Sequence, residues 1–137
     1  MAHDGQVGLD SHGIGVGIAR LYAAEGAQVI VCGRRAERGQ TVVDTITAEG
    51  GKASFHAMDI TVPSSIEKLV EDTVSTYGRI DVLVNNAANV GLKDGRVDEV
   101  TLEMWDDIFI SELVPILLLS KGFCQVKTEG GASLCPA

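Results

Sequence analysis

A glycine-rich stretch that leads into an amphipathic segment and a short β-branched run constrains the fold of this chain most strongly. Gly13 and Gly15 can take backbone angles that are forbidden to other residues, and they leave room for a ligand's phosphates to approach the main chain. The next segment predicts a helix that ends at Gly26 and buries the apolar residues Ile14, Ile18, Leu21 and Tyr22. The run 29–32 predicts a buried parallel strand. Glycine turn, helix and strand in this order are typical of a dinucleotide-binding fold, in which the helix N-terminus receives a pyrophosphate.

Two arginines occupy the position that usually selects between NAD and NADP. An acidic residue about 20 residues beyond the glycines holds a ribose 2′-hydroxyl, whereas an arginine there suits a 2′-phosphate. This chain carries Gly33, Arg34 and Arg35 at that position, which favours NADP over NAD as the cofactor. At the start of the following helix, both cations would be slightly unfavourable without an anionic partner. The alternative interpretation is a pair of solvated arginines in a loop.

The charge of the chain restricts its partners. The 137 residues are the length of one domain, 1–137, and they carry a net charge of −8. This charge argues against a nucleic-acid or anionic-membrane surface, because such surfaces need clustered lysine and arginine. The phosphates of a dinucleotide must therefore be met locally, by backbone dipoles and by the Arg34–Arg35 pair.

Cysteine usage and hydropathy indicate a cytoplasmic protein. Cys32, Cys124 and Cys135 match no metal-binding or redox spacing, so we expect reduced thiols and no metal site. No basic-then-apolar signal opens the sequence. The longest apolar run, 113–119, has seven residues and contains Pro115, so it is too short to span a membrane.

The rest of the chain predicts an α/β fold in which an incomplete, doubly wound parallel sheet lies between two layers of helices. The first strand is expected to be lost or reduced to a stub, because only Val7 and Leu9 are apolar before the glycine turn. The later elements are expected to be a helix over 36–49, a strand over 52–58, a helix over 63–77, a strand over 80–84 and a helix from about 101. The 63–77 helix is expected to begin with Pro63 and a Ser64–Glu67 capping box, and to end at Gly78. The last helix is expected to bury Trp105, Ile108, Phe109, Leu113, Ile116 and Leu117.

Five motifs occur in order along the chain: Gly13-Ile14-Gly15, Gly33-Arg34-Arg35, Asp59-Ile60, Asn85-Asn86-Ala87-Ala88 and Trp105-Asp106. In this order and at this spacing, they make the chain similar to the N-terminal, Rossmann-like half of a short-chain dehydrogenase/reductase. The resemblance covers Gly13 to about Gly131, and five ordered motifs are far more specific than a lone glycine pattern.

The resemblance implies a dinucleotide site, with roles that pass residue by residue to the matching positions. Ser11, His12, Gly13, Ile14 and Gly15 would line the phosphates, with His12 assisting a 2′-phosphate that Arg34 and Arg35 bind. Asp59 would accept a hydrogen bond from the adenine amino group beside Ile60; the alternative is a carboxylate that the next helix dipole stabilises. Asn85, Asn86, Ala87 and Ala88 would pass close to the adenine ribose; the alternative is a plain turn, although the C-terminal end of a strand favours the site.

The chain also departs from the family pattern. The Thr-Gly pair expected three residues before Gly13 is missing in its usual form. Glu112 stands where the family has an asparagine, and Pro115 would interrupt the helix. Catalysis in this family uses a serine and a Tyr-x-x-x-Lys pair, but Tyr22 is followed four residues on by Gly26 and Tyr77 by Asp81. No catalytic residue is therefore assigned.

Three hypotheses follow from these features. The first is an NADP-dependent oxidoreductase of this family, truncated and inactive, whose parent reaction is hydride transfer between an alcohol and a carbonyl of unknown identity. The second is a non-catalytic module that binds NADP, forms a homo-oligomer or docks on a full-length relative through the 101–125 helix. The third is a degenerate fragment without activity, which a missing central strand would favour.

Overall fold

A four-stranded parallel sheet lies at the centre of the structure, a computed structural model that describes residues 4–9, 13–86 and 100–129. The strand order is β3-β2-β1-β4, so β1 lies between strands that follow it in the chain. The strands are β1 (Asp4–Leu9), β2 (Gln28–Gly33), β3 (Lys52–Ala57) and β4 (Val82–Val84).

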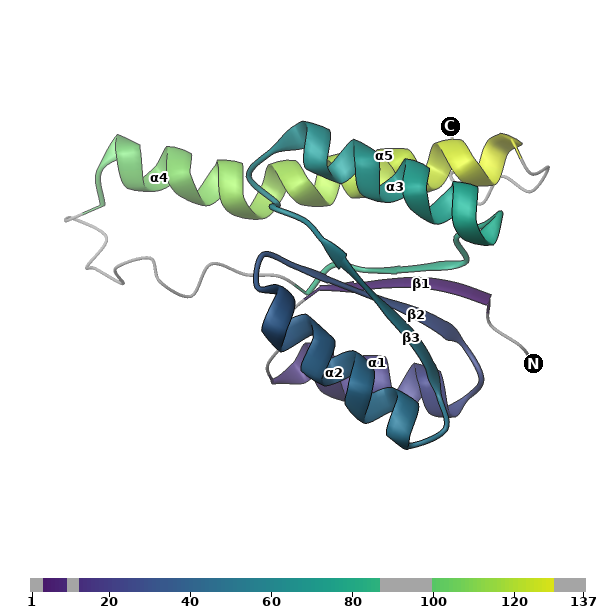
Figure 1. The fold of residues 1–137 in the computed structure, drawn as a ribbon. Coiled ribbons are helices and arrows are strands. Elements are labelled where there is room, and N and C mark those ends of the chain that lie inside the picture. The colour runs from purple at the N-terminus through teal and green to yellow at the C-terminus, as the bar shows by residue number, and fades with distance from the viewer. Residues whose placement is uncertain (1–3, 10–12, 87–99, 130–137) are drawn as a thin grey trace.

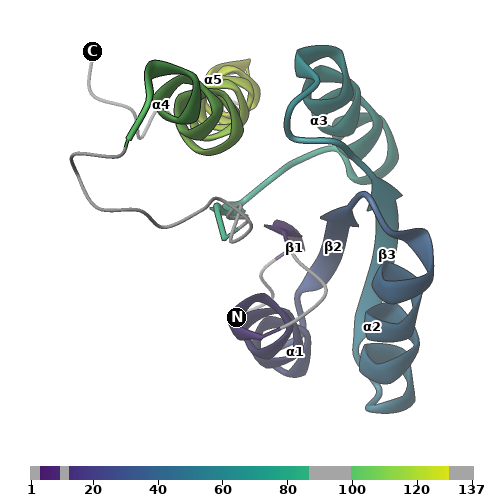
Figure 2. The same cartoon turned by 90° about the vertical axis from the view of Figure 1, so that its left-hand side faces the viewer.

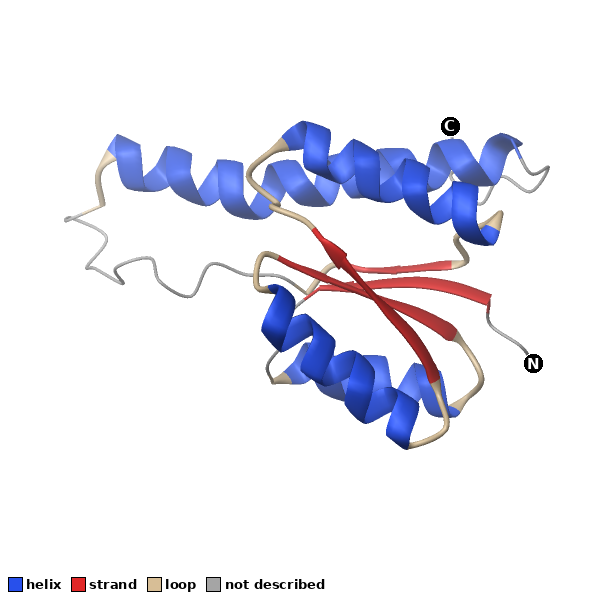
Figure 3. Ribbon diagram, viewed as in Figure 1, coloured by secondary structure: helices blue, strands red, loops and turns tan. Residues whose placement is uncertain are grey.

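Helices cover both faces of this sheet, which gives three layers (Figures 1 and 3). The helices are α1 (Ile14–Ala24), α2 (Ala36–Ala48), α3 (Pro63–Tyr77), α4 (Leu102–Ile108) and α5 (Val114–Glu129). The side view in Figure 2 shows α1 and α2 on one face and α3, α4 and α5 on the other. This arrangement confirms the predicted α/β class with an incomplete parallel sheet.

The first strand is present, so the expectation of a stub is wrong. β1 has six residues and pairs in parallel with both neighbours, so that Gln6 lies opposite Val29 of β2 and Val82 of β4. The ladder consists of backbone N–H and C=O groups, which polar residues and glycine supply as well as apolar ones. The hypothesis of a degenerate fragment therefore loses the missing central strand on which it rested.

Two apolar cores form on the two faces of β2, as predicted for a buried parallel strand. Val29 and Val31 pack with α1 and α2, whereas Ile30 and Cys32 pack with α3 and α5. All four are at most 3% exposed. Because successive side chains of β2 point to opposite faces of the sheet, this one strand contributes to both cores.

The buried face of α1 differs from the predicted one. Gly15, Ala19 and Ala23 face the sheet at intervals of four residues, whereas Ile14 is 76% and Leu21 64% exposed. Small side chains let the helix axis approach the strands closely, and this close packing outweighs the larger apolar area that the predicted face would bury.

The start of α3 also differs in detail. Pro63 is at the first turn and Gly78 ends the helix in the left-handed conformation, as predicted. The predicted capping box is absent, because the residue at the N-cap position is Val62, whose side chain cannot accept a hydrogen bond. A different serine forms a hydrogen bond near the start of this helix: Ser65 Oγ accepts one from the backbone N–H of Asp59, at 3.0 Å.

The last helical segment contains an irregular turn where proline predicts an interruption. A π-helical turn, η2 (Phe109–Leu113), joins α4 to α5 directly before Pro115. Proline has no N–H to donate and its ring crowds the carbonyl of residue 111, so the chain widens its turn there.

The face that this segment buries is not the predicted one. Leu119 is buried, and Gly122 packs against Val70 of α3. By contrast, Phe109 and Leu117 are 42% and 66% exposed, and most of the other predicted core residues of this helix are exposed with them. Apolar residues occur on several sides of this helix, so periodicity alone does not identify the side that meets α3.

The described residues test two expectations, one on the state of the cysteines and one on membrane-spanning helices. Cys32 is a buried free thiol, as expected, and burial raises its pKa. Cys124 is disulfide-bonded, so the expectation of reduced thiols throughout is wrong. Spacing motifs do not report how close two cysteines come in the fold. Among these residues, no helix has the length and hydropathy to cross a membrane.

We expect Gly39→Ala to destabilise the fold. A Cβ at residue 39 of α2 would lie 2.1 Å from the Phe55 ring of β3, so strand and helix would have to separate, which costs about 1–3 kcal/mol. Urea unfolding followed by circular dichroism measures the change. Gly17→Ala in α1 is the matched control: nothing lies within 4 Å of its Cβ position, and alanine there should raise helix stability by up to about 1 kcal/mol. Equal effects of the two substitutions would contradict the packing argument.

Candidate functional site

The residues expected to form the site collect at one edge of the sheet. In each case they follow the carboxyl end of a strand, and these ends meet at the same edge because the strands are parallel. The described ones are Gly13, Ile14 and Gly15 after β1, Arg34 and Arg35 after β2, Asp59 and Ile60 after β3, and Asn85 and Asn86 after β4. The expected residues Ser11, His12, Ala87 and Ala88 lie outside the described residues.

The glycine turn leaves the start of α1 open. Gly13 is the N-cap residue with φ +74°, a left-handed conformation that favours glycine, and it has no side chain to cap the helix. Among the described residues, no atom lies within 4 Å of its Cβ position. The first N–H groups of α1 therefore receive no side-chain cap from residue 13, and they lie at the positive end of the helix dipole, which suits an anionic group.

Three arginines surround the start of α2. Arg34 and Arg35 are exposed, and Arg35 is the N-cap residue, with no capping hydrogen bond from its side chain. Arg38, also exposed, lies in the first turn, and sequence analysis missed it although its spacing of three from Arg35 places it on the same side of the helix. Among the described residues, no ion pair involves any of these three guanidinium groups, whereas Arg20 pairs with Glu49.

Asp59 is held as a charged group close to the arginines. Its Oδ1 accepts hydrogen bonds from the Thr61 hydroxyl at 2.7 Å and from the Thr61 backbone N–H at 2.9 Å. These bonds hold the pKa of Asp59 below its ordinary value, and the charge of Arg34 lowers the pKa further. The other carboxylate oxygen, Oδ2, forms no hydrogen bond within the described part of the chain, so it can accept one from a ligand.

Neither tyrosine lies at this edge. Tyr77 is the last residue of α3, and its hydroxyl lies 3.0 Å from Ser54 Oγ, which is near the start of β3. Tyr22 packs, partly buried, against the core beneath α1 and α2. Both tyrosines thus lie away from the edge that carries the expected cofactor site.

Two further expectations concern Glu112 and metal binding. Glu112 belongs to η2, and its side chain lies outside what the structure describes. Among the described residues, no group of three or more His, Cys, Asp or Glu side chains could hold a metal ion.

Comparison with protein families and curated proteins finds similar chains. A family model described as short chain dehydrogenase matches residues 8–132, which contain all five motifs of the resemblance. Granaticin polyketide synthase putative ketoacyl reductase 1 from Streptomyces violaceoruber is 35% identical over 119 residues, which are 87% of this chain and 42% of that protein. The chain spans about half the length of the curated relatives that it matches, from 42% to 49%.

Solved structures share the fold over nearly the whole chain. A metagenomic short-chain oxidoreductase in complex with NADP superposes with a TM-score of 0.87 at 30% identity, over 97% of this chain and 60% of that one. An actinorhodin polyketide ketoreductase with NADPH superposes with a TM-score of 0.86 at 30% identity, over 97% of this chain and 52% of that one.

Thr61→Val should raise the pKa of Asp59 toward its ordinary value, because it removes the hydroxyl bond, the largest cause of the lowering. A carbon-detected NMR titration of the Asp59 carboxyl measures this pKa. Thr61→Ser keeps a hydroxyl and should leave the pKa low. A pKa in Thr61→Val equal to that of the unaltered chain would contradict the assigned cause.

Proposed function

We propose, since the chain belongs to the short-chain dehydrogenase family, that it is the cofactor-binding part of an NADP(H)-dependent oxidoreductase. The observation that carries the proposal is the set of exposed arginines at the start of α2, which form no ion pair with any residue that the structure describes, in a chain with a net charge of −8. Like charges at the positive end of a helix dipole are unfavourable without an anion. A 2′-phosphate supplies that anion, and a ribose 2′-hydroxyl does not.

The described residues fit such a cofactor along one edge of the sheet. The pyrophosphate would bind at the open turn of Gly13, Ile14 and Gly15, and the 2′-phosphate would bind Arg34 and Arg35. The adenine amino group would donate to Asp59 Oδ2, with Ile60 beside the ring. Asn85, Asn86, Ala87 and Ala88 would lie along the adenine ribose, and Ser11 and His12 would complete the phosphate contacts. Two similar solved structures, one in complex with NADP and the other with NADPH, support this assignment.

The proposed reaction is the family's hydride transfer between an alcohol and a carbonyl, with the cofactor as hydride donor or acceptor. The residues of this chain would bind and orient the cofactor. Neither of its two tyrosines has a lysine four residues on, so the proposal assigns no proton-transfer group within these 137 residues. On this proposal the chain by itself binds the cofactor without turnover.

A second candidate function is docking through the last helical segment. Trp105, Phe109, Leu113 and Leu117 recur at intervals of four residues, and we call this row the apolar ridge. Its members are 42–66% exposed, and the rings of Trp105 and Phe109 lie 5.4 Å apart. A contiguous exposed apolar surface of this kind is typical of an interface. The proposed occupant is a second copy of the chain, and a full-length relative is the alternative.

Arg34→Ala should weaken NADPH binding much more than NADH binding. Loss of a charge-assisted hydrogen bond, worth about 1.5–3 kcal/mol, weakens binding by roughly 10- to 100-fold. Isothermal titration calorimetry with both cofactors measures the ratio of affinities. Lys52→Ala, an exposed cation at the start of β3 and therefore at the opposite edge of the sheet, is the control and should leave the ratio unchanged. Equal affinities of the unaltered chain for NADPH and NADH would refute the proposed NADP preference.

Leu117→Lys should disrupt self-association if the apolar ridge is the interface. Burial of a leucine side chain contributes about 1.5–3 kcal/mol, so self-association should weaken by about tenfold or more. Sedimentation velocity over a concentration series measures the change. Leu21→Lys on α1 is the matched control, because Leu21 is 64% and Leu117 66% exposed. An unaltered chain that sediments as a monomer at every concentration would exclude the second copy as occupant.

A further inference from the structure

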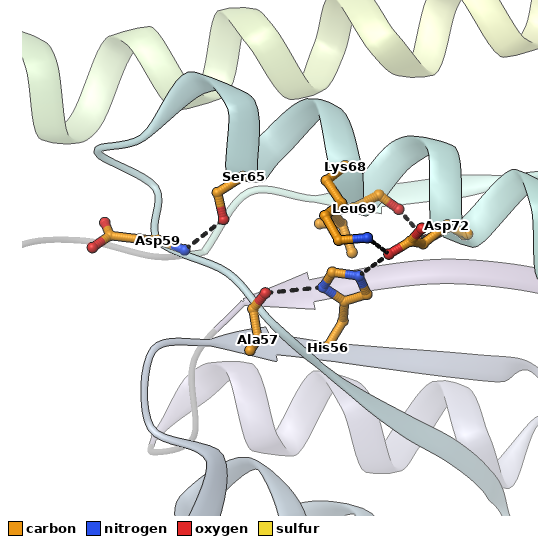
Figure 4. A network of polar contacts seen from close by, with 8 residues as sticks. His56, Ala57, Asp59, Ser65, Lys68, Leu69 and Asp72 are labelled. Atoms are coloured by element: carbon orange, nitrogen blue, oxygen red, sulfur yellow. Dashed lines mark hydrogen bonds and ion pairs between the residues drawn. The ribbon is translucent and has the colours of Figure 1, made fainter.

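His56 lies between two hydrogen-bond acceptors on the edge strand β3 (Figure 4). Its Nε2 is 2.9 Å from Asp72 Oδ2 on α3, and its Nδ1 is 3.0 Å from the carbonyl oxygen of Ala57. The His56 side chain is 22% exposed and that of Asp72 is 44% exposed. This ring is outside the residues assigned to the cofactor.

Neither acceptor can donate a hydrogen bond to the ring. The Ala57 oxygen is a carbonyl, and the Asp72 carboxylate is ionised at neutral pH, because hydrogen bonds from Lys68 and then from His56 lower its pKa. A neutral imidazole has one N–H, so its other nitrogen would direct a lone pair at an oxygen about 3 Å away. Only the imidazolium form donates to both oxygens. Both contacts can therefore be hydrogen bonds at the same time only when the ring is protonated.

The two hydrogen bonds join the end of β3 to the middle of α3. Residues 58–62, which we call the Asp59 loop, connect these two elements. Ala57 is the last residue of β3, so the peptide whose oxygen His56 binds leads directly into the Asp59 loop. Asp59, the second residue of the loop, donates its N–H to Ser65 Oγ of α3 (Figure 4), and the Met58 N–H donates to the Gly33 carbonyl oxygen of β2 at 3.0 Å. The His56 and Ser65 contacts thus join the first residues of the Asp59 loop to α3.

We propose that protonated His56 is a positioning residue for the Asp59 loop, and that loss of its proton releases the Ala57 carbonyl and shifts the loop. The bond to Asp72 is kept, because a hydrogen bond to a charged acceptor is the stronger of the two. The loop is held at low pH and released as pH rises through the titration of the ring. The consequence for cofactor affinity rests on the proposed function, since Asp59 is the proposed adenine contact.

The other titratable groups around the ring come from α3, β2, β3 and α5. On α3 these are Asp72, whose pKa is lowered, and Lys68, whose Nζ lies 2.8 Å from the same Asp72 oxygen and whose pKa is raised. On β2 the register partner is Cys32, whose pKa burial raises. Lys52 shares the His56 face of β3, Glu71 and Lys121 are exposed on α3 and α5, and Tyr77 binds Ser54. The NMR signals of the ring itself therefore distinguish a transition of His56 from one of these groups.

A pH titration of the isotope-labelled full chain by NMR tests the proposal without any cofactor. The expected result is that both ring nitrogens of His56 are protonated at the acidic end, and that the amide signals of Met58, Asp59 and Thr61 move with the same midpoint as the ring. In His56→Gln, the amide nitrogen of Gln can still donate to Asp72 but does not titrate, so these amide signals should stay fixed. The proposal is overturned if the three amide signals do not follow the ring, or if they move equally in His56→Gln.

Asp72→Asn is a second variant in case His56→Gln does not give a dispersed spectrum. Without the carboxylate, the ring should lose its proton at lower pH than in the unaltered chain, and the loop amides should follow it. Retention of the original midpoint would overturn the proposal, because the proton would then not depend on the Asp72 contact.

Titration of NADPH at a pH on either side of the His56 midpoint tests the consequence for the site. The unaltered chain should lose affinity severalfold at the higher pH, and His56→Gln should not, whereas protonation of the cofactor itself affects both equally. An identical pH dependence in the two chains would overturn the link between His56 and cofactor binding. If the unaltered chain binds no NADPH at either pH, the proposed function fails, while the amide titration still decides whether His56 positions the loop.

Discussion

The backbone ladder that places β1 between β2 and β4 is the constraint on which the rest of the structure depends. The first crossover leads from β1 to β2 on one side, and the later chain returns to pair β4 on the other side. Connections that diverge in this way leave a crevice beyond the carboxyl ends of the central strands, where open α/β sheets bind ligands. The turn at Gly13 and the start of α1 lie at this position.

The charge of the arginines at this edge of the sheet is opposite in sign to the net charge of the chain. The chain is acidic overall, yet Arg34, Arg35 and Arg38 are near the start of one helix without an ion-pair partner among the described residues. Such a local field can guide an anion to the edge even though the net charge repels it. Asp59 lies close enough for Arg34 to affect its pKa, so the site presents an acceptor beside its donors.

The order of elements and the edge that carries the site could be predicted from sequence, because glycine turns and apolar periodicity report local structure directly. β1 could not, since the ladder of Asp4–Leu9 depends on neighbours distant in sequence. Leu21 and Leu117 were predicted to be buried but are exposed. The helices instead pack through small residues such as Ala19 and Gly122, and this choice of face depends on tertiary contacts that periodicity does not report. Arg38 and His56 carry no motif, and only their positions in the fold indicate a role.

The close contact between Gly39 and the Phe55 ring has a consequence for the evolution of this surface. Phe55 occupies the volume into which any side chain at residue 39 would extend. Among homologues, a larger residue at position 39 should therefore occur together with a smaller residue at position 55, and glycine at position 39 with a large residue at position 55. The two sites, 16 positions apart in the sequence, are expected to vary as a pair rather than independently.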